Sequence, residues 1–146
     1  MKKVIITGGA GFIGSNLATR LLYENIEKLL IIDDLSTGTE SNLKNILLDQ
    51  KVDFINSKIE DIEDLNAVFD GYDFCYHLAA GVGVQYIMDN LSESLLTNIL
   101  ATHKVLEVCQ DRNIPVLLTS TSEAVSYTHL RAHETEADLV CRLLLE

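Results

Sequence analysis

The sequence predicts an α/β fold built on a parallel β-sheet. Short apolar runs of strand-like composition alternate with segments whose apolar residues recur at helical spacing, and this alternation is typical of right-handed β-α-β crossovers. Two of the runs, Val4-Ile5-Ile6 and Leu29-Leu30-Ile31-Ile32, are apolar at every position, as expected for strands covered on both faces. The 146 residues are 47% hydrophobic, which is sufficient for the core of one domain.

Strands and helices are expected in strict alternation along the chain. The strands are predicted at Lys3 to Thr7, Leu29 to Asp33, Val52 to Asn56, Phe74 to His77 and Val116 to Thr119. The helices are predicted near Ile13 to Tyr23, Ser41 to Leu47, Asp61 to Phe69 and Leu95 to Asp111. In parallel sheets of this kind, ligands bind beyond the carboxyl ends of the strands. The residues that end each strand are therefore the candidates for a functional site.

A glycine-rich turn follows the first strand and opens into the first helix. Gly8 is expected to let the chain turn, Gly11 to let the backbone approach a pyrophosphate, and Gly14 to let the helix pack closely on the sheet. The free N–H groups at the positive end of that helix would then face phosphate groups. The alternative is a flexible turn without a ligand. The strand before it, the helix after it and a suitably spaced acidic residue favour a dinucleotide site.

That acidic residue is Asp33, which ends the second strand about 20 residues beyond the glycine turn. Its carboxylate is expected to accept hydrogen bonds from the hydroxyls of the adenosine ribose. We interpret the neighbouring Asp34 as a solvated loop residue. A 2′-phosphate would face both carboxylates, with no arginine between Arg20 and Arg112 to neutralise it, so NAD is favoured over NADP.

Further candidates follow the later strands. Asp61 is expected to cap the third helix, to contact an adenine, or both. The small residues after His77, in Leu78-Ala79-Ala80-Gly81, would let a cofactor lie flat across the strand end, with His77 itself packed in the strand. Asn98 either bridges to strand backbone or is an ordinary exposed helical asparagine. The hydroxyls of residues 119–122 suit hydrogen bonding to a substrate oxygen, or they form a plain polar strand exit.

Charge and composition narrow the classes of partner. The net charge of −11 is spread along the chain without a basic cluster, so neither nucleic acid nor an anionic membrane is expected as a partner. No apolar run approaches the roughly 20 residues of a membrane span, and without a signal peptide a cytoplasmic protein is expected. The three cysteines lack CxxC spacing. We therefore expect Cys75 and Cys109 to be buried hydrophobes, with no metal site.

Several ordered motifs resemble those of the extended short-chain dehydrogenase/reductases that act on nucleotide sugars. The motifs are TGGAGFIGS, IIDD, EDI, HLAA, TNI and TSTSE, and the resemblance runs from residue 1 to about Glu123. It implies a Rossmann-type, doubly wound sheet that binds NAD. The cofactor-binding positions that it implies are Gly8, Gly11, Phe12 and Ile13 around the pyrophosphate, Asp33 at the ribose, Asp61 and Ile62 near the adenine, and Leu78, Ala79 and Ala80 along the cofactor. We add Gly14 and Asn98, which the motifs also contain, as further cofactor-binding candidates.

The resemblance also implies an activity. In that family NAD takes a hydride from C4 of the sugar, and the 4-keto product is epimerised, dehydrated or decarboxylated. Thr121 is implied as the catalytic hydroxyl, with Glu123 as an acid/base candidate. Dehydratases commonly have Thr-Asp-Glu here, whereas this chain has Ser122 in the middle, which favours a UDP-hexose 4-epimerase or a UDP-glucuronate decarboxylase. The complete protein is expected to be a homodimer. A non-catalytic NAD-binding regulator and a reductase of a non-sugar substrate are the alternatives.

The chain departs from the family pattern after Glu123. The family's Tyr-x-x-x-Lys pair, in which the lysine lowers the pKa of the tyrosine that acts as base, is absent. Tyr127 and Arg131 imitate its spacing, but Tyr127 lies too close in sequence to Thr121, and a guanidinium does not replace a compact ammonium. The chain by itself is therefore expected to be catalytically inactive.

The last residues are expected to be non-native. VSYTHLRAHET resembles the translation of a transposase-based sequencing adaptor, and DLVCRLLLE resembles the translation of the flow-cell sequence that follows it. We therefore expect residues 1–124 to be an incomplete NAD-binding domain, truncated before the catalytic Tyr-Lys helix and the substrate domain. Residues 125–146 would be a tail without an evolved function.

Overall fold

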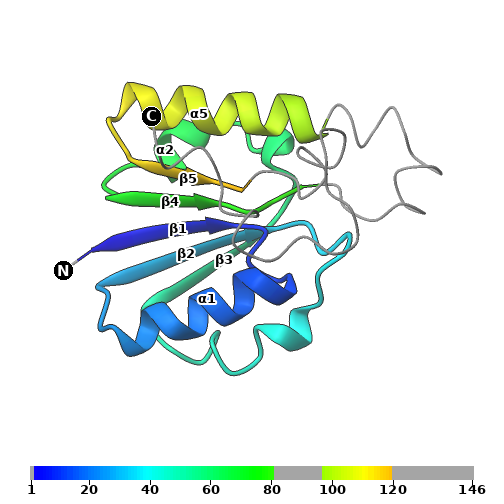
Figure 1. Cartoon of the computed structure of the whole chain (residues 1–146), viewed down its shortest axis with the longest axis vertical. Helices are drawn as coiled ribbons and strands as arrows, with labels where there is room; N and C mark the ends of the chain where they lie inside the picture. The colour runs from blue at the N-terminus through cyan, green and yellow to red at the C-terminus, as the bar shows by residue number, and fades with distance from the viewer. Residues whose placement is uncertain (1, 81–96, 120–146) are drawn as a thin grey trace, which may run out of the picture.

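The computed structural model describes residues 2–80 and 97–119, which form a five-stranded parallel sheet with helices on both faces (Figure 1). The strand order is β3-β2-β1-β4-β5. The strands are β1 (Lys3–Thr7), β2 (Lys28–Asp33), β3 (Val52–Asn56), β4 (Phe74–His77) and β5 (Val116–Leu118). Each lies within one residue of its predicted bounds. The α/β, doubly wound fold class is thus confirmed, with the chain reversing its direction across the sheet between β1 and β4.

The two faces of the sheet carry separate cores. Helix α1 (Phe12–Tyr23) covers one face, while α2 (Leu65–Val68) and α5 (Thr102–Asp111) cover the other (Figure 1). In β1, Val4 packs in the core that includes Ala18 of α1, and Ile5 packs in the core that includes Val105 of α5. This burial on both faces explains why the strand is apolar at every position. Cys75 and Cys109 are buried free thiols in the second core, as predicted.

The prediction of a helix from Ser41 to Leu47 is wrong. The chain forms a short 3₁₀ helix, η1 (Glu40–Asn42), followed by turns. Ile46 N donates to the Leu43 carbonyl at 2.8 Å, a bond that spans three residues rather than four. Leu43 and Ile46 are nevertheless buried, because residues three apart lie on one side of a 3₁₀ turn. The apolar spacing therefore predicted the buried side chains correctly and the kind of helix incorrectly.

The prediction that the third helix begins at Asp61 is also wrong, because α2 spans Leu65–Val68. Asp61 does not cap it, because Asp61 ends a 3₁₀ helix, η2 (Ile59–Asp61). The cap of α2 is Asp64, whose Oδ1 accepts a hydrogen bond from Ala67 N at 2.9 Å. Before α5 the chain forms a π-helical turn, η3 (Thr97–Ala101), and the first two residues of the expected helix lie outside the described residues. In the part of the chain that the structure describes, no helix is long and apolar enough to cross a membrane.

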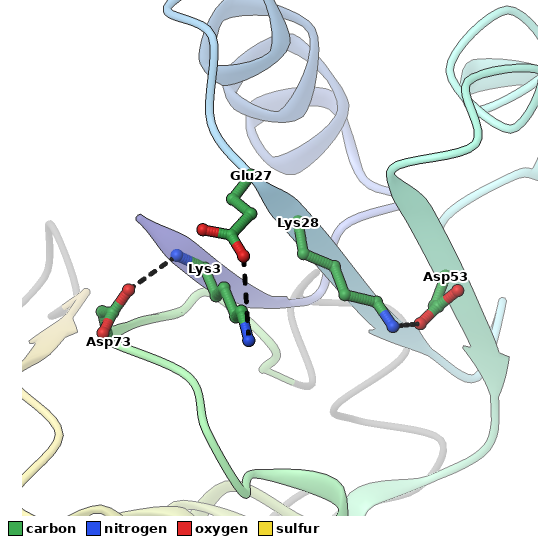
Figure 2. Close-up of polar contacts among 5 residues, drawn as sticks. All are labelled: Lys3, Glu27, Lys28, Asp53 and Asp73. Carbon is green, nitrogen blue, oxygen red and sulfur yellow. Dashed lines mark hydrogen bonds and ion pairs between the residues drawn. The ribbon is translucent and has the colours of Figure 1, made fainter. Parts of the chain in front are cut away.

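Charged side chains pair across the amino-terminal edge of the sheet (Figure 2). Lys28 Nζ of β2 lies 2.6 Å from Asp53 Oδ2 of β3, and Lys3 Nζ lies 3.9 Å from Glu27 Oε1. The backbone N–H of Lys3 donates to Asp73 Oδ2 at 2.8 Å. The hydrogen bond with Asp53 raises the pKa of Lys28. The charges at this edge are therefore satisfied by one another.

Candidate functional site

The candidate site lies at the opposite edge, where the carboxyl ends of β1, β2 and β4 meet. Gly8, just after β1, donates its N–H to the Ile32 carbonyl of β2 at 2.8 Å. Leu78, just after β4, donates its N–H to the Thr7 carbonyl of β1 at 3.0 Å. These bonds bring three strand exits together at the point where the strand order reverses, which is the usual ligand position in open α/β sheets.

The glycine turn is closely packed on two sides and open on a third. Gly8 has a φ of 73°, and a β-carbon there would lie 2.7 Å from Ala79 N. A β-carbon on Gly14 would lie 2.3 Å from the Gly8 carbonyl oxygen, so the first turn of α1 packs against the glycine turn itself. Among atoms of the described residues, a β-carbon on Gly11 would meet only that same oxygen, at 3.4 Å. The open side at Gly11 is therefore where a ligand can approach the backbone.

The start of α1 presents unfilled hydrogen-bond donors. Its N-cap, Gly11, offers no capping side chain, and its first turn contains no acidic residue. Among the described residues, the N–H groups of Phe12, Ile13 and Gly14 have no acceptor. The side chains of Phe12 and Ile13 are 83% and 67% exposed, so they leave this helix end open. Converging N–H groups at a positive helix end fit a pyrophosphate.

Asp33 supports the turn from the end of β2. The residue is 9% exposed; its Oδ2 accepts from Ala10 N at 2.9 Å, and its Oδ1 accepts from Leu35 N at 2.8 Å. Each oxygen keeps a further acceptor position, so the side chain can hold the turn and still accept a ribose hydroxyl. Asp34 instead accepts from Ser36 N and Ser36 Oγ at 3.0 and 2.7 Å, which makes it a local turn residue.

His77 is packed in the strand, as predicted, and is 1% exposed. Its Nδ1 lies 2.6 Å from Thr7 Oγ1, and its Nε2 lies 3.0 Å from Thr102 Oγ1. Because Thr7 Oγ1 also accepts from Ala79 N at 3.3 Å, every group is satisfied when the Thr7 hydroxyl donates to Nδ1 and Nε2–H donates to Thr102. Burial lowers the pKa of His77 to about 4, so the ring is neutral near neutral pH. This network fixes the exit of β4 against the glycine turn.

The other predicted cofactor positions lie around the same edge. Asp61 is exposed at the end of η2, and Ile62 is partly buried against the α5-side core. The residues after β4 change from partly buried at Leu78 and Ala79 to exposed at Ala80, and Asn98 is partly buried in η3. The predicted catalytic residues, Thr121 and Glu123, lie outside the described residues, as does the 125–146 tail.

Three residues that the sequence analysis did not single out contribute to the site. Thr7 and Thr102 form the His77 network, and Asn42 of η1 donates from Nδ2 to the Ala10 carbonyl at 2.8 Å. Thr7 carries a detectable signal, since it is a polar residue at the fully buried end of an apolar strand. Lys104 of α5 also donates to the Glu60 carbonyl at 2.6 Å, which ties η2 to α5. No spacing in the sequence indicates the Asn42 or Lys104 contacts.

Comparisons with known proteins agree with this geometry. A family model described as the NAD dependent epimerase/dehydratase family matches residues 4–139. The uncharacterized UDP-glucose epimerase YtcB of Bacillus subtilis is 33% identical over 129 residues, which cover 84% of this chain and 40% of that protein. UDP-glucuronic acid decarboxylase 6 of Arabidopsis thaliana is 30% identical over 121 residues, which cover 83% of this chain and 34% of that protein.

A solved structure shows the same fold. It is the UDP-N-acetylglucosamine 4-epimerase of Methanobrevibacter ruminantium M1 in complex with UDP-N-acetylmuramic acid, with a TM-score of 0.78 and 31% sequence identity. The match covers 91% of this chain and 43% of that one. Across these three proteins, the chain spans between 34% and 43% of their length, always the N-terminal portion.

Proposed function

Since this chain belongs to the NAD dependent epimerase/dehydratase family, we propose that it is the NAD-binding portion of a nucleotide-sugar epimerase or decarboxylase. The observation that carries the proposal is the pairing of unfilled backbone donors at the start of α1 with the Asp33 carboxylate beside them. A dinucleotide needs both features, since its pyrophosphate accepts hydrogen bonds and its ribose donates them. The cofactor of this family is NAD.

Each part of the edge would serve one part of the cofactor. The N–H groups of Phe12 and Ile13 would hold the pyrophosphate, with Gly11 leaving room for it. Asp33 would orient the adenosine ribose while it holds the turn. Asp61 and Ile62 would lie near the adenine, and Leu78 to Ala80 would lie along the cofactor. When bound, NAD would accept a hydride reversibly from C4 of the sugar.

The substrate that we propose is a UDP-sugar. The three similar proteins described above carry UDP-sugar names, and one of them was solved with a UDP-sugar bound. We propose Thr121 as a hydroxyl that contacts the reacting oxygen, with Glu123 as an acid/base group. The complete protein is proposed to be a cytoplasmic homodimer.

The binding role of Asp33 can be separated from general charge effects at the site. We expect Asp33→Ala to weaken NAD binding by about 1.5–3 kcal/mol, the range for hydrogen bonds to a charged group. Asp34→Ala removes the same charge one residue away and is the matched control, because within the described part of the chain Asp34 bonds only to Ser36 of its own turn. Calorimetric titration of both variants measures the difference. Equal affinities in the two variants would contradict the proposed role of Asp33.

We also propose that the chain alone does not turn over nucleotide sugars. The sequence lacks the Tyr-x-x-x-Lys pair that would supply the base for the C4 hydroxyl, and the loss of a general base typically removes about 10²–10⁴ in rate. The test incubates the chain with NAD and UDP-, dTDP- and GDP-hexoses, following NADH absorbance and products by chromatography. Turnover that Tyr127→Phe abolishes would overturn the proposal, since it would assign Tyr127 the role of base.

For the tail, we propose that residues 125–146 add nothing to stability. Deleting them is expected to leave the free energy of unfolding nearly unchanged or slightly higher, because the sheet was not selected to receive this segment. A denaturant titration compares the full and the shortened chain. A loss of several kcal/mol in the shortened chain would identify the tail as a genuine packed element.

A further inference from the structure

Both peptide groups that flank Ala10, in the middle of the glycine turn, are held by side chains from the β2 side of the sheet. The N–H of Ala10 donates to Asp33 Oδ2 at 2.9 Å. Its carbonyl accepts from Asn42 Nδ2 at 2.8 Å and, less closely, from Thr39 N at 3.3 Å. Ala10 itself is fully buried. The turn is therefore fixed by an acceptor on one peptide and by a donor on the next.

The second of these peptides leads directly into α1. A peptide group is planar, so fixing the Ala10 carbonyl also fixes the N–H of Gly11, the N-cap of the helix. The Gly11 N–H has only a long bond of its own, 3.4 Å to the Gly8 carbonyl. The shorter Asn42 contact is thus the stronger restraint on the direction in which the chain enters the helix.

The segment that carries Asn42 is held in place on both sides of that residue. The next residue, Leu43, is fully buried in the α1-side core. The backbone of Gly38 lies directly against the turn, since a β-carbon on Gly38 would lie 2.8 Å from the Ala10 carbonyl carbon. The backbone that positions the Asn42 amide next to Ala10 is therefore fixed by packing, although Asn42 itself is largely exposed.

We infer that Asn42 is a positioning residue of the NAD site, which acts through the Ala10–Gly11 peptide to aim the N–H groups of α1 at the pyrophosphate. This inference rests on the proposed function. It gives the connection between β2 and β3 a role in binding phosphate.

The test compares Asn42→Asp and Asn42→Ala with Asn45→Asp. The aspartate at 42 replaces the donor by an acceptor that repels the Ala10 carbonyl, whereas the alanine only removes the donor. Asn45→Asp makes the same charge change in the same segment, and Asn45 is exposed and makes no side-chain hydrogen bond with the described residues. We expect NAD affinity to fall about tenfold in Asn42→Asp, less in Asn42→Ala and not at all in Asn45→Asp.

Two further readouts distinguish positioning from general damage to the fold. ADP-ribose, which contains the pyrophosphate, should lose affinity for Asn42→Asp as NAD does, whereas adenosine, which lacks it, should not. In the cofactor-free protein, the NMR signal of the Gly11 amide should shift in Asn42→Asp and stay in place in Asn45→Asp. Equal NAD affinity in Asn42→Asp and Asn45→Asp, or an equal loss for adenosine, would overturn the inference. Absence of NAD binding in the unmodified chain would overturn the proposed function itself.

Discussion

The amino-terminal and carboxyl-terminal edges of the sheet differ in how their polar groups are hydrogen-bonded. At the amino edge, charged side chains such as Lys28 and Asp53 satisfy one another at the surface (Figure 2). At the carboxyl edge, the side chains of Asp33 and His77 are buried and hydrogen-bonded. Backbone N–H groups at the start of α1 have no acceptor among residues 2–80 and 97–119. Among the described residues, charged side chains pair with one another at the amino edge, whereas N–H donors without an acceptor gather at the carboxyl edge. Free N–H groups at a helix start are a feature that anion-binding sites share.

This comparison also ranks the two edges by their sensitivity to substitution. Exposed ion pairs contribute little to stability, because solvent screens them and long side chains lose freedom. Buried polar groups and closely packed backbone contribute more, since a lost partner or a clash there is not relieved by water. Substitutions at the carboxyl edge should therefore have the larger effects.

The largest effect is expected at Gly14. A β-carbon there would lie 2.3 Å from the Gly8 carbonyl oxygen, so Gly14→Ala forces α1 away from the turn and should lower the free energy of unfolding by about 3 kcal/mol. Gly11→Ala is the matched control, because a β-carbon on Gly11 meets only one atom, at 3.4 Å. That variant should keep its stability and lose NAD affinity. Denaturant titrations of both test this, and similar stabilities would show that α1 tolerates displacement.

A comparable effect is expected at His77, but only at acidic pH. Burial lowers the pKa of His77 in the folded protein to about 4 from an ordinary value of 6.5. The unfolded chain therefore binds the extra proton first, so stability falls as the pH drops from 6.5 to about 4, by roughly 3 kcal/mol from this residue alone. In His77→Gln this contribution should vanish, whereas His103→Gln, at an exposed position on α5, should keep it. An unchanged pH dependence in His77→Gln would rule out this origin.

The smallest effect is expected at the amino edge. The side chains of Lys28 and Asp53 are 44% and 51% exposed. A double-mutant cycle with Lys28→Met and Asp53→Asn should give a coupling energy close to zero, which salt reduces further. A large coupling energy, or one insensitive to salt, would mean that this edge is as rigid as the carboxyl edge and would remove the contrast.

The sheet was predictable because burial on both faces leaves little choice of residue. Strand positions such as Ile5 and Ile31 face helices from either side, so apolar character at every position marks them directly. The segment around Leu43 and Ile46 was not predictable in the same way, since three-residue spacing suits both an α-helix and 3₁₀ turns. The connection instead follows contacts with the glycine turn that only the folded chain provides.

The positions of site residues were predictable where the local structure requires one particular type of residue. Gly8 follows from the need for a positive φ at a strand-to-helix turn, and its φ is 73°. The position of Asp33 beside that turn also followed from its spacing, whereas its bond to a ribose hydroxyl stays a prediction. The cap of α2 was missed because Asp61 and Asp64 both suit a helix start, and only the geometry selects Asp64. Asn42 was missed because its partner is a backbone carbonyl 32 residues away, and a carbonyl leaves no trace in the sequence.

The measurement that most directly tests the central claim is an equilibrium titration of the unmodified chain with NAD and with NADP. The claim is that unfilled donors at the start of α1 and the Asp33 carboxylate form a site for NAD. The account predicts saturable binding of NAD at one site, with NADP bound more weakly because its 2′-phosphate meets the Asp33 carboxylate. Binding of NADP as tight as that of NAD, or no saturable binding of either, would contradict it.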